Sequence, residues 1–132
     1  MAVSDAGSLP VALSTFCASP HEVTLVETTI EERFTRKLPE KLIGDRAYDS
    51  DKLDEALASQ EVEMISPHRR NRKSVATQDG RKLRRYKRRW KVERLFAWLQ
   101  NFRRVRIRDD FYPENYEGFV QLAGISILLR RF

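Results

Sequence analysis

The stretch KLIGDRAYDSDKLDEALASQEVEMISP, residues 41–67, decides the class of fold. It opens with KLIGD, residues 41–45, whose short apolar run is typical of a brief buried strand that ends at Gly44–Asp45. Ser50 then precedes a segment in which Leu53 and Leu57 lie four residues apart, and this predicts a capped helix with one buried face. VEMIS continues as a second strand until a proline ends it. Strand, helix and strand in this order predict an α/β fold with helices packed on a sheet.

The segments before this stretch extend the alternation of strands and helices. LPVALSTF, residues 9–16, predicts a short strand. Ser19 is followed by a proline and predicts the N-cap of a helix. Apolar residues then recur at helical spacing as far as Phe34, and Pro39 limits the helix.

The segments after it are basic and then apolar. Residues 68–82 form a polar, basic loop without apolar periodicity. From about Lys82 to Phe102 we predict the longest helix, whose apolar seam is formed by Val92, Leu95, Phe96 and Leu99. FVQLAGISILLRRF, residues 119–132, predicts a terminal apolar helix. At 132 residues the chain fits one domain, 1–132, with its basic loop and helix at 68–108.

Charge is segregated along the chain. Residues 1–65 carry 6 Lys and Arg against 13 Asp and Glu, residues 66–108 carry 17 against 2, and residues 109–132 carry 2 against 4. The middle block, with a net charge of +15, repels itself unless a polyanion compensates it, and nucleic acid is the usual one. A solvated basic helix is the alternative interpretation. No apolar run approaches the roughly 20 residues that span a bilayer, so no membrane partner is expected.

Two carboxylates are candidates for chemistry. Asp45 follows a buried strand, where a sheet holds a carboxylate rigidly while its oxygens face solvent, which suits a hard cation such as magnesium. Asp49 and Asp51 have simpler interpretations, as turn residues and as negative charge at the start of the next helix. Glu93 is the second candidate because it is the only acid between residues 80 and 108. Its alternative role is a plain salt bridge to a neighbouring arginine.

Three stretches, LIGDRAYDSDKLDEAL, EMISPHRRNR and TQDGRKLRRYKRRWKVERLFAWLQNFRRV, together resemble the C-terminal half of bacterial insertion-sequence transposases. That family carries an Asp–Asp–Glu triad on a ribonuclease H-like fold. Its Tyr-x2-Arg-x3-Glu signature matches Tyr86, Arg89 and Glu93, and its Gly-Asp-(Arg/Lys)-Ala-Tyr-Asp-Ser motif matches the second catalytic Asp at Asp45. The family pattern continues with Lys seven residues after the Glu, where this sequence has Gln100.

The resemblance implies a DNA transposase with a mixed ribonuclease H-like sheet flanked by helices. Asp45 and Glu93 would be catalytic and would hold two Mg²⁺ or Mn²⁺ ions for phosphodiester cleavage and strand transfer. The implied partner is double-stranded DNA, at the transposon ends and at the target. The complete protein is expected to form a homo-oligomer in the bacterial cytoplasm, associated with the nucleoid. The implied DNA-binding residues are Tyr86, Arg89, Arg69, Arg70, Arg72, Lys82, Arg85 and Arg88.

The first Asp of the triad has no match. Asp5, in DAGSLP, matches the turn between the family's second and third strands instead. We therefore expect the fold to lack the family's first strand and the isolated chain to be weakly active or inactive. Two other classes stay open. One is a non-catalytic DNA-binding protein derived from a transposase, which has no use for Asp45 and Glu93; the other is a ribonuclease H-like RNA nuclease.

Overall fold

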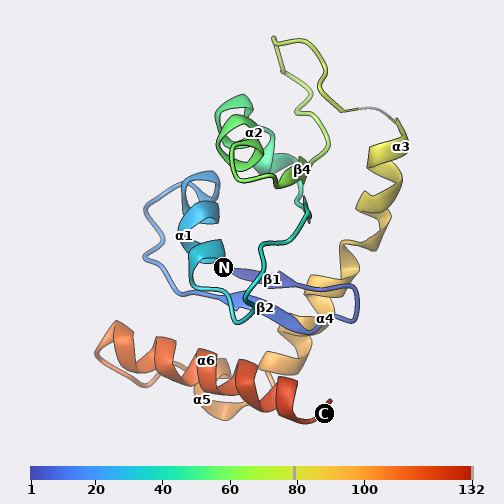
Figure 1. The fold of residues 1–132 in the computed structure, drawn as a ribbon. Coiled ribbons are helices and arrows are strands. Elements are labelled where there is room, and N and C mark those ends of the chain that lie inside the picture. Colours follow the sequence, from blue (N-terminus) through green and yellow to red (C-terminus); the bar gives the residue numbers. More distant parts are fainter. Residues whose placement is uncertain (79, 132) are drawn as a thin grey trace. The chain divides into compact units, whose positions relative to one another are not determined.

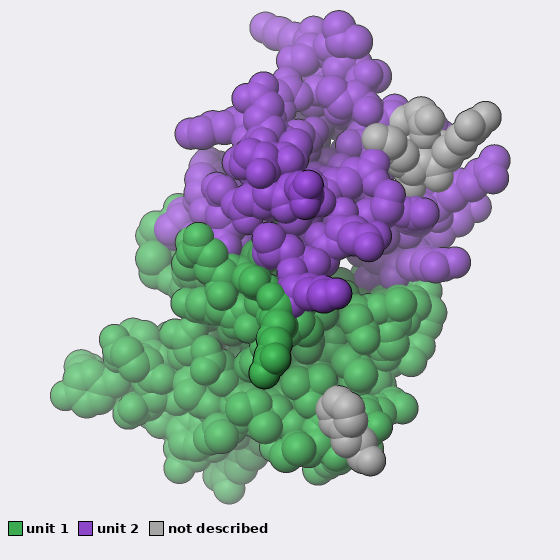
Figure 2. Space-filling model, viewed as in Figure 1, with its two compact units in different colours: residues 1–19, 28–36, 90–132 green, residues 20–27, 37–89 purple. Residues whose placement is uncertain are grey.

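The computed structural model describes residues 1–78 and 80–131, without the side chains of Arg81 and Lys82 (Figure 1). This part of the chain divides into two compact units, coloured green and purple in Figure 2. Unit 1 comprises Met1–Ser19, Thr28–Arg36 and Trp90–Phe132, and unit 2 comprises Pro20–Glu27 and Lys37–Arg89. The assignment of residues 1–132 to one domain stays a prediction.

Unit 1 contains an antiparallel hairpin of β1 (Ala2–Ser4) and β2 (Pro10–Leu13). The predicted strand at residues 9–16 is confirmed as β2, whereas β1 was not predicted from the sequence. Asp5 shapes the turn between the strands, because its Oδ1 accepts hydrogen bonds from the N–H of Gly7 at 2.7 Å and of Leu9 at 2.8 Å. Asp5 therefore has a structural role in a turn between two strands, as its sequence context indicates.

The core of unit 1 lies between this hairpin and the C-terminal helices (Figure 1). The helices are α4 (Trp90–Leu99), α5 (Arg103–Arg106) and α6 (Pro113–Leu129). The terminal helix is confirmed, but it begins at Pro113, because proline is well suited to the first position of a helix. The buried apolar residues of this core are Leu13, Leu95, Leu99, Val120, Ala123 and Ile127.

The prediction of one long helix from Lys82 to Phe102 is wrong. The segment is divided into α3 (Gly80–Leu83), the 3₁₀ helix η3 (Arg84–Arg88) and α4, and the longest helix of the described residues is α6. Seven of the nine residues from 81 to 89 are Lys or Arg. Like charges three and four residues apart destabilise a continuous helix, and we expect this repulsion to favour the break.

The predicted apolar seam of this helix is confirmed only in part. Leu95 and Leu99 are buried and Val92 is half-buried, but Phe96 is 45% exposed. Trp98 packs against the core of unit 1, as expected of a large aromatic side chain.

The helix predicted after Ser19 is shorter than expected. It consists of the 3₁₀ helix η1 (Glu22–Leu25) and of α1 (Val26–Glu31). Ser19 is not its N-cap, because the extended backbone of His21 places the start of η1 two residues later. Past the end of α1, the N–H of Phe34 donates to the carbonyl of Val11 at 2.8 Å, so this segment lies along β2 instead of continuing the helix.

Unit 2 contains the predicted strand–helix–strand segment. β3 (Lys41–Ile43) pairs in parallel with β4 (Glu63–Ile65), and α2 (Asp51–Ala58) connects them. Ser50 caps α2, with its Oγ accepting from the N–H of Leu53 at 3.4 Å, and the two predicted core leucines are buried. The order of these elements, the cap and the two buried leucines are confirmed, because hydrophobic spacing and cap residues act locally. The predicted burial of the first strand is confirmed only at Leu42, since Lys41 and Ile43 are exposed.

The described chain is thus a mixed α/β structure with one antiparallel and one parallel strand pair. None of the helices in the described ranges combines the length and the apolar character that a bilayer-spanning segment needs.

Candidate active site

Asp45 lies two residues after the end of β3, where the sequence placed it. It is the N-cap of the 3₁₀ helix η2 (Arg46–Tyr48), and its Oδ1 accepts a hydrogen bond from the N–H of Ala47 at 2.8 Å. Its side chain is 40% exposed. The capping bond fixes the direction of the carboxylate while leaving oxygen surface in contact with solvent.

Close packing determines which residue can precede Asp45. Gly44 is buried, and its N–H donates to the carbonyl of Ile65 at 3.0 Å, which extends the β3–β4 ladder by one bond. A Cβ at this position would lie 2.5 Å from Cε of Met64 and 2.7 Å from Cδ2 of Tyr48. A glycine is therefore required here so that Tyr48 can pack beneath the turn that begins at Asp45.

Tyr48 is a neutral hydrogen-bond donor in this turn. Burial, the charge of Glu22, a hydrogen bond to Glu22 and the charge of Asp45 together raise the pKa of Tyr48 from 10.0 to about 12. The phenol thus keeps its proton and can donate to the Glu22 carboxylate throughout the neutral range.

Arg89 connects the two sequence motifs in space. Its Nη1 lies 3.5 Å from Oδ2 of Asp45, and the two side chains are each 40% exposed. The guanidinium also lies over the ring of Tyr86, 5.6 Å from its centroid, so these two residues of the family signature are in contact. At this exposure the ion pair adds little stability, and its main effect is to orient the Asp45 carboxylate.

Glu93 lies in the first turn of α4 and is exposed. It belongs to unit 1, whereas Asp45 belongs to unit 2, so the structure describes the two carboxylates separately. Among the described residues, no three His, Cys, Asp or Glu side chains are grouped in a way that could hold a metal ion. Asp45 by itself offers one hard oxygen ligand of the kind that Mg²⁺ binds.

The predicted DNA-binding residues differ in their surroundings. Arg70, Arg85 and Arg88 are exposed, while the side chain of Lys82 lies outside the described residues. Arg69 donates from Nε to the carbonyl of Arg46 at 3.1 Å and from Nη2 to that of Ala47 at 2.6 Å. Arg69 is therefore already bonded to the Asp45 turn.

Arg72 is also engaged. Its Nη1 lies 2.5 Å from Oδ1 of Asp49, and its Nη2 bonds to Asp51. The side chain of Arg72 is only 10% exposed. A guanidinium bonded to two carboxylates and largely covered is poorly placed to bind phosphate as well.

Asp49 and His68 form a contact that the sequence analysis missed. Asp49 is buried, and its Oδ1 lies 2.9 Å from Nδ1 of His68. Burial raises the pKa of the Asp49 carboxyl, but hydrogen bonds from Arg69 and His68 and the charge of Arg72 outweigh it and lower that pKa below 3.8. The sequence contained a signal for this contact, because both residues follow strands of a strand–helix–strand segment. Such strands run parallel, and their carboxyl ends lie at the same sheet edge.

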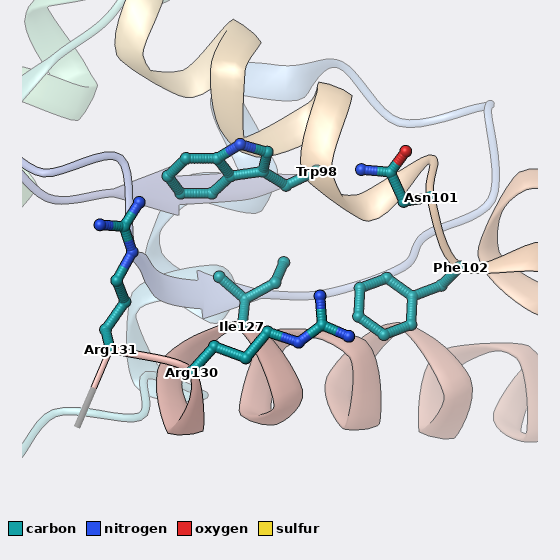
Figure 3. A pocket seen from close by; sticks show the side chains of 6 residues that line it. All are labelled: Trp98, Asn101, Phe102, Ile127, Arg130 and Arg131. Carbon is teal, nitrogen blue, oxygen red and sulfur yellow. The ribbon is translucent and has the colours of Figure 1, made fainter.

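A pocket of about 140 Å³ lies in unit 1, between the C-terminal ends of α4 and α6 (Figure 3). The guanidinium of Arg131 lies 5.2 Å from the ring of Trp98, and that of Arg130 lies 5.8 Å from the ring of Phe102. Two guanidinium groups make this pocket unsuitable for a cation. The described residues that line it are Trp98, Asn101, Phe102, Ile127, Arg130 and Arg131.

Comparison with known proteins agrees with the class of protein that the sequence motifs around Asp45 and Glu93 indicate. The model of the family "Transposase DDE domain" matches residues 1–115, and the chain belongs to this family. It is also 33% identical over 129 residues to a Burkholderia cepacia protein named "Putative transposase for insertion sequence element IS402". That match covers 92% of this chain and 57% of the relative, so the chain spans little more than half the length of that protein. No solved structure gives a significant match.

Proposed function

We propose that the chain forms part of a transposase that cleaves DNA phosphodiesters and transfers strands. The observation that carries this proposal is the contact between Arg89 and Asp45. It joins the two motif stretches within one unit, although the residues lie 44 positions apart in the sequence. Membership in the transposase family supports the same function.

In this proposal Asp45 and Glu93 are the catalytic carboxylates and the ligands of two Mg²⁺ or Mn²⁺ ions. When bound, such ions supply Lewis acidity to the attacking and leaving oxygens of a phosphodiester. Asp45 is already oriented by the N–H of Ala47 and by Arg89, which limits its reorganisation on binding a cation. Arg89, stacked on Tyr86, also provides positive charge beside the scissile phosphate.

The DNA backbone is bound by exposed basic side chains. Arg70, Arg85 and Arg88 are exposed in unit 2 and would contact phosphates without reading bases. We retain double-stranded DNA, at transposon ends and target, as the partner and a homo-oligomer as the complete assembly. The ribonuclease H-like sheet is part of the same proposal, since a sheet of that type contains both antiparallel and parallel pairs.

A metal-binding titration tests the carboxylates independently of catalysis. Mn²⁺ is added to the wild-type chain and to Asp45→Asn and Glu93→Gln, and bound ion is measured by electron paramagnetic resonance. We expect both substitutions to weaken Mn²⁺ binding, because each removes a charged oxygen ligand. The matched control is Glu55→Gln, which removes an exposed acid from α2 and should leave Mn²⁺ binding unchanged.

DNA affinity with and without Mg²⁺ separates this proposal from a protein that only binds DNA. In a transposase site, Mg²⁺ strengthens the binding of duplex DNA and the two carboxylate variants lose this effect. A pure binder shows no Mg²⁺ effect, and its affinity is preserved or raised when Asp45 and Glu93 are neutralised. Equal Mn²⁺ binding by all four proteins would contradict the proposed metal ligands.

A further inference from the structure

Asp49, interpreted from the sequence as a turn residue, is at the centre of a charged cluster in unit 2. Its Oδ2 accepts from the N–H of Arg69 at 2.7 Å, and its Oδ1 contacts both Nδ1 of His68 at 2.9 Å and Nη1 of Arg72 at 2.5 Å. Only 9% of Asp49 is exposed. A buried carboxylate with three charged or polar partners is costly to remove, because its loss leaves each partner without that hydrogen bond.

His68 extends this cluster to the far end of the basic loop. Its Nε2 lies 3.1 Å from the N–H nitrogen of Thr77 and 3.2 Å from that of Gln78. Both groups are donors, so Nε2 must be the accepting, unprotonated nitrogen. The proton of the neutral ring is then on Nδ1 and is donated to Asp49, which closes residues 68–78 into a loop tied at both ends.

Arg69 connects the closed loop to the candidate catalytic carboxylate. Its main-chain N–H is bound by Asp49, and its guanidinium donates to the carbonyls of Arg46 and Ala47. Asp45 binds the N–H of that same Ala47. The turn that carries Asp45 is therefore bonded on one side by its own carboxylate and on the other by Arg69.

We propose that Asp49, His68 and Arg72 are positioning residues of the active site, referred to below as the loop clamp. They hold residues 68–78 so that Arg69 braces the Asp45 turn and the exposed Arg70 and Lys73 lie ready for DNA phosphates. Arg72 thus acts through Asp49 and not by contacting DNA, which replaces its sequence-based assignment. This inference rests on the proposed function, since the bound polyanion is the DNA of the transposition reaction.

The sharpest test removes a negative charge from the clamp. Simple electrostatics predicts that Asp49→Asn binds duplex DNA more tightly, because one repulsive charge is lost. The loop clamp predicts the opposite, roughly tenfold weaker binding, because the loop is no longer held. Glu55→Gln, on the exposed face of α2, removes the same charge outside the clamp and should bind DNA as well as or better than the wild type.

A double-mutant comparison distinguishes the two roles of Arg72. If Arg72 acts through Asp49, then Asp49→Asn, Arg72→Gln and the double variant lose similar DNA affinity, because each breaks the same unit. If Arg72 binds a phosphate, the losses add, and Arg72→Gln reduces the salt dependence of binding by about one unit of slope. The second result would overturn the assignment.

The histidine tautomers provide a readout that does not depend on DNA. Nitrogen-15 NMR of the imidazole rings at neutral to mildly alkaline pH should show His68 with its proton on Nδ1. His21, which is exposed, is the control in the same spectrum and should show no such restriction. In Asp49→Asn the His68 signal should lose its tautomer preference. A His68 signal that matches that of His21 in the wild type would contradict the clamp.

A conservative variant covers the case in which Asp49→Asn does not fold. His68→Asn retains a donor near the position of Nδ1 and should recover part of the affinity that His68→Ala loses. The positioning role alone would be overturned if the wild type shows the Nδ1 tautomer of His68 and binds duplex DNA, but neither His68→Ala nor His68→Asn changes that binding. If the wild type shows the Nδ1 tautomer of His68 but does not bind duplex DNA, the proposed function is contradicted instead.

Discussion

At the scale of single residues, Gly44 and Tyr48 set the position of Asp45. Gly44 leaves room for the Tyr48 ring and for Met64, and Tyr48 packs under the turn while hydrogen bonded to Glu22. None of these side chains reacts in the proposed chemistry. They determine where the Asp45 carboxylate lies, and each can be tested by a single substitution.

Gly44→Ala should destabilise unit 2. The added methyl group would meet Met64 at 2.5 Å and the Tyr48 ring at 2.7 Å, so the ring must move. Overpacking of this kind costs about 1–3 kcal/mol, measurable as a shift of the urea midpoint. Gly118→Ala is the control, because nothing lies within 4 Å of its Cβ and it should leave α6 unchanged or more stable. Equal stability of the two variants would contradict the packing argument.

Tyr48→Phe should flatten the loss of stability at alkaline pH. The pKa of Tyr48 is raised on folding from 10.0 to about 12, so the folded state binds more protons between these values. Stability from this group is complete below pH 10 and is lost as pH rises through about 12. Urea unfolding across this range should show a shallower decline in the variant. The exposed Tyr112→Phe is the control and should keep the wild-type slope.

At the scale of elements, the basic segment 80–89 is divided by its own charge. The predicted helix extended from its apolar seam at residues 92–99 back into this segment, but the lysines and arginines of residues 80–89 repel one another at helical neighbour positions. The sequence pattern therefore predicted the type of element and missed its interruption. Screening or neutralising the charge should favour the continuous helix.

Far-UV circular dichroism can test this explanation. Raising sodium fluoride from about 0.1 to 1 M shortens the screening length from about 10 to 3 Å and should increase the helical signal. Each relieved like-charge pair contributes about 0.2–0.5 kcal/mol. The variant Arg84→Gln/Arg88→Gln should start with more helix and respond less to salt. A helical signal that is independent of salt in both proteins would show that the break has another cause.

At the scale of the whole molecule, the segregated charge predicts strongly salt-dependent DNA binding. If about five phosphates are neutralised, the plot of log affinity against log salt should have a slope of about −4 to −5. Arg85→Ala and Arg88→Ala should each reduce its magnitude by about 1, for any duplex sequence. Lys52→Ala, exposed on α2, is the control. A slope near zero would mean that the basic block does not contact DNA.

The sequence by itself determined the features that depend on local spacing. The strand–helix–strand segment, its Ser50 cap, the terminal helix and the block of positive charge all follow from residues a few positions apart. The two motifs also identified the transposase family before any geometry was known. These signals are local because helix and strand periodicity and helix capping are properties of short segments.

Only the tertiary structure decided how distant residues meet. The parallel pairing of β3 and β4 brings Asp49 to His68 and Arg72, and the fold of unit 2 places Arg89 beside Asp45, 44 positions away in the sequence. Parallel strands end at the same edge of a sheet, so residues after each strand become neighbours whatever lies between them. For this reason the pattern identified Asp45 as a candidate ligand, while the residues that hold it became visible only in the fold.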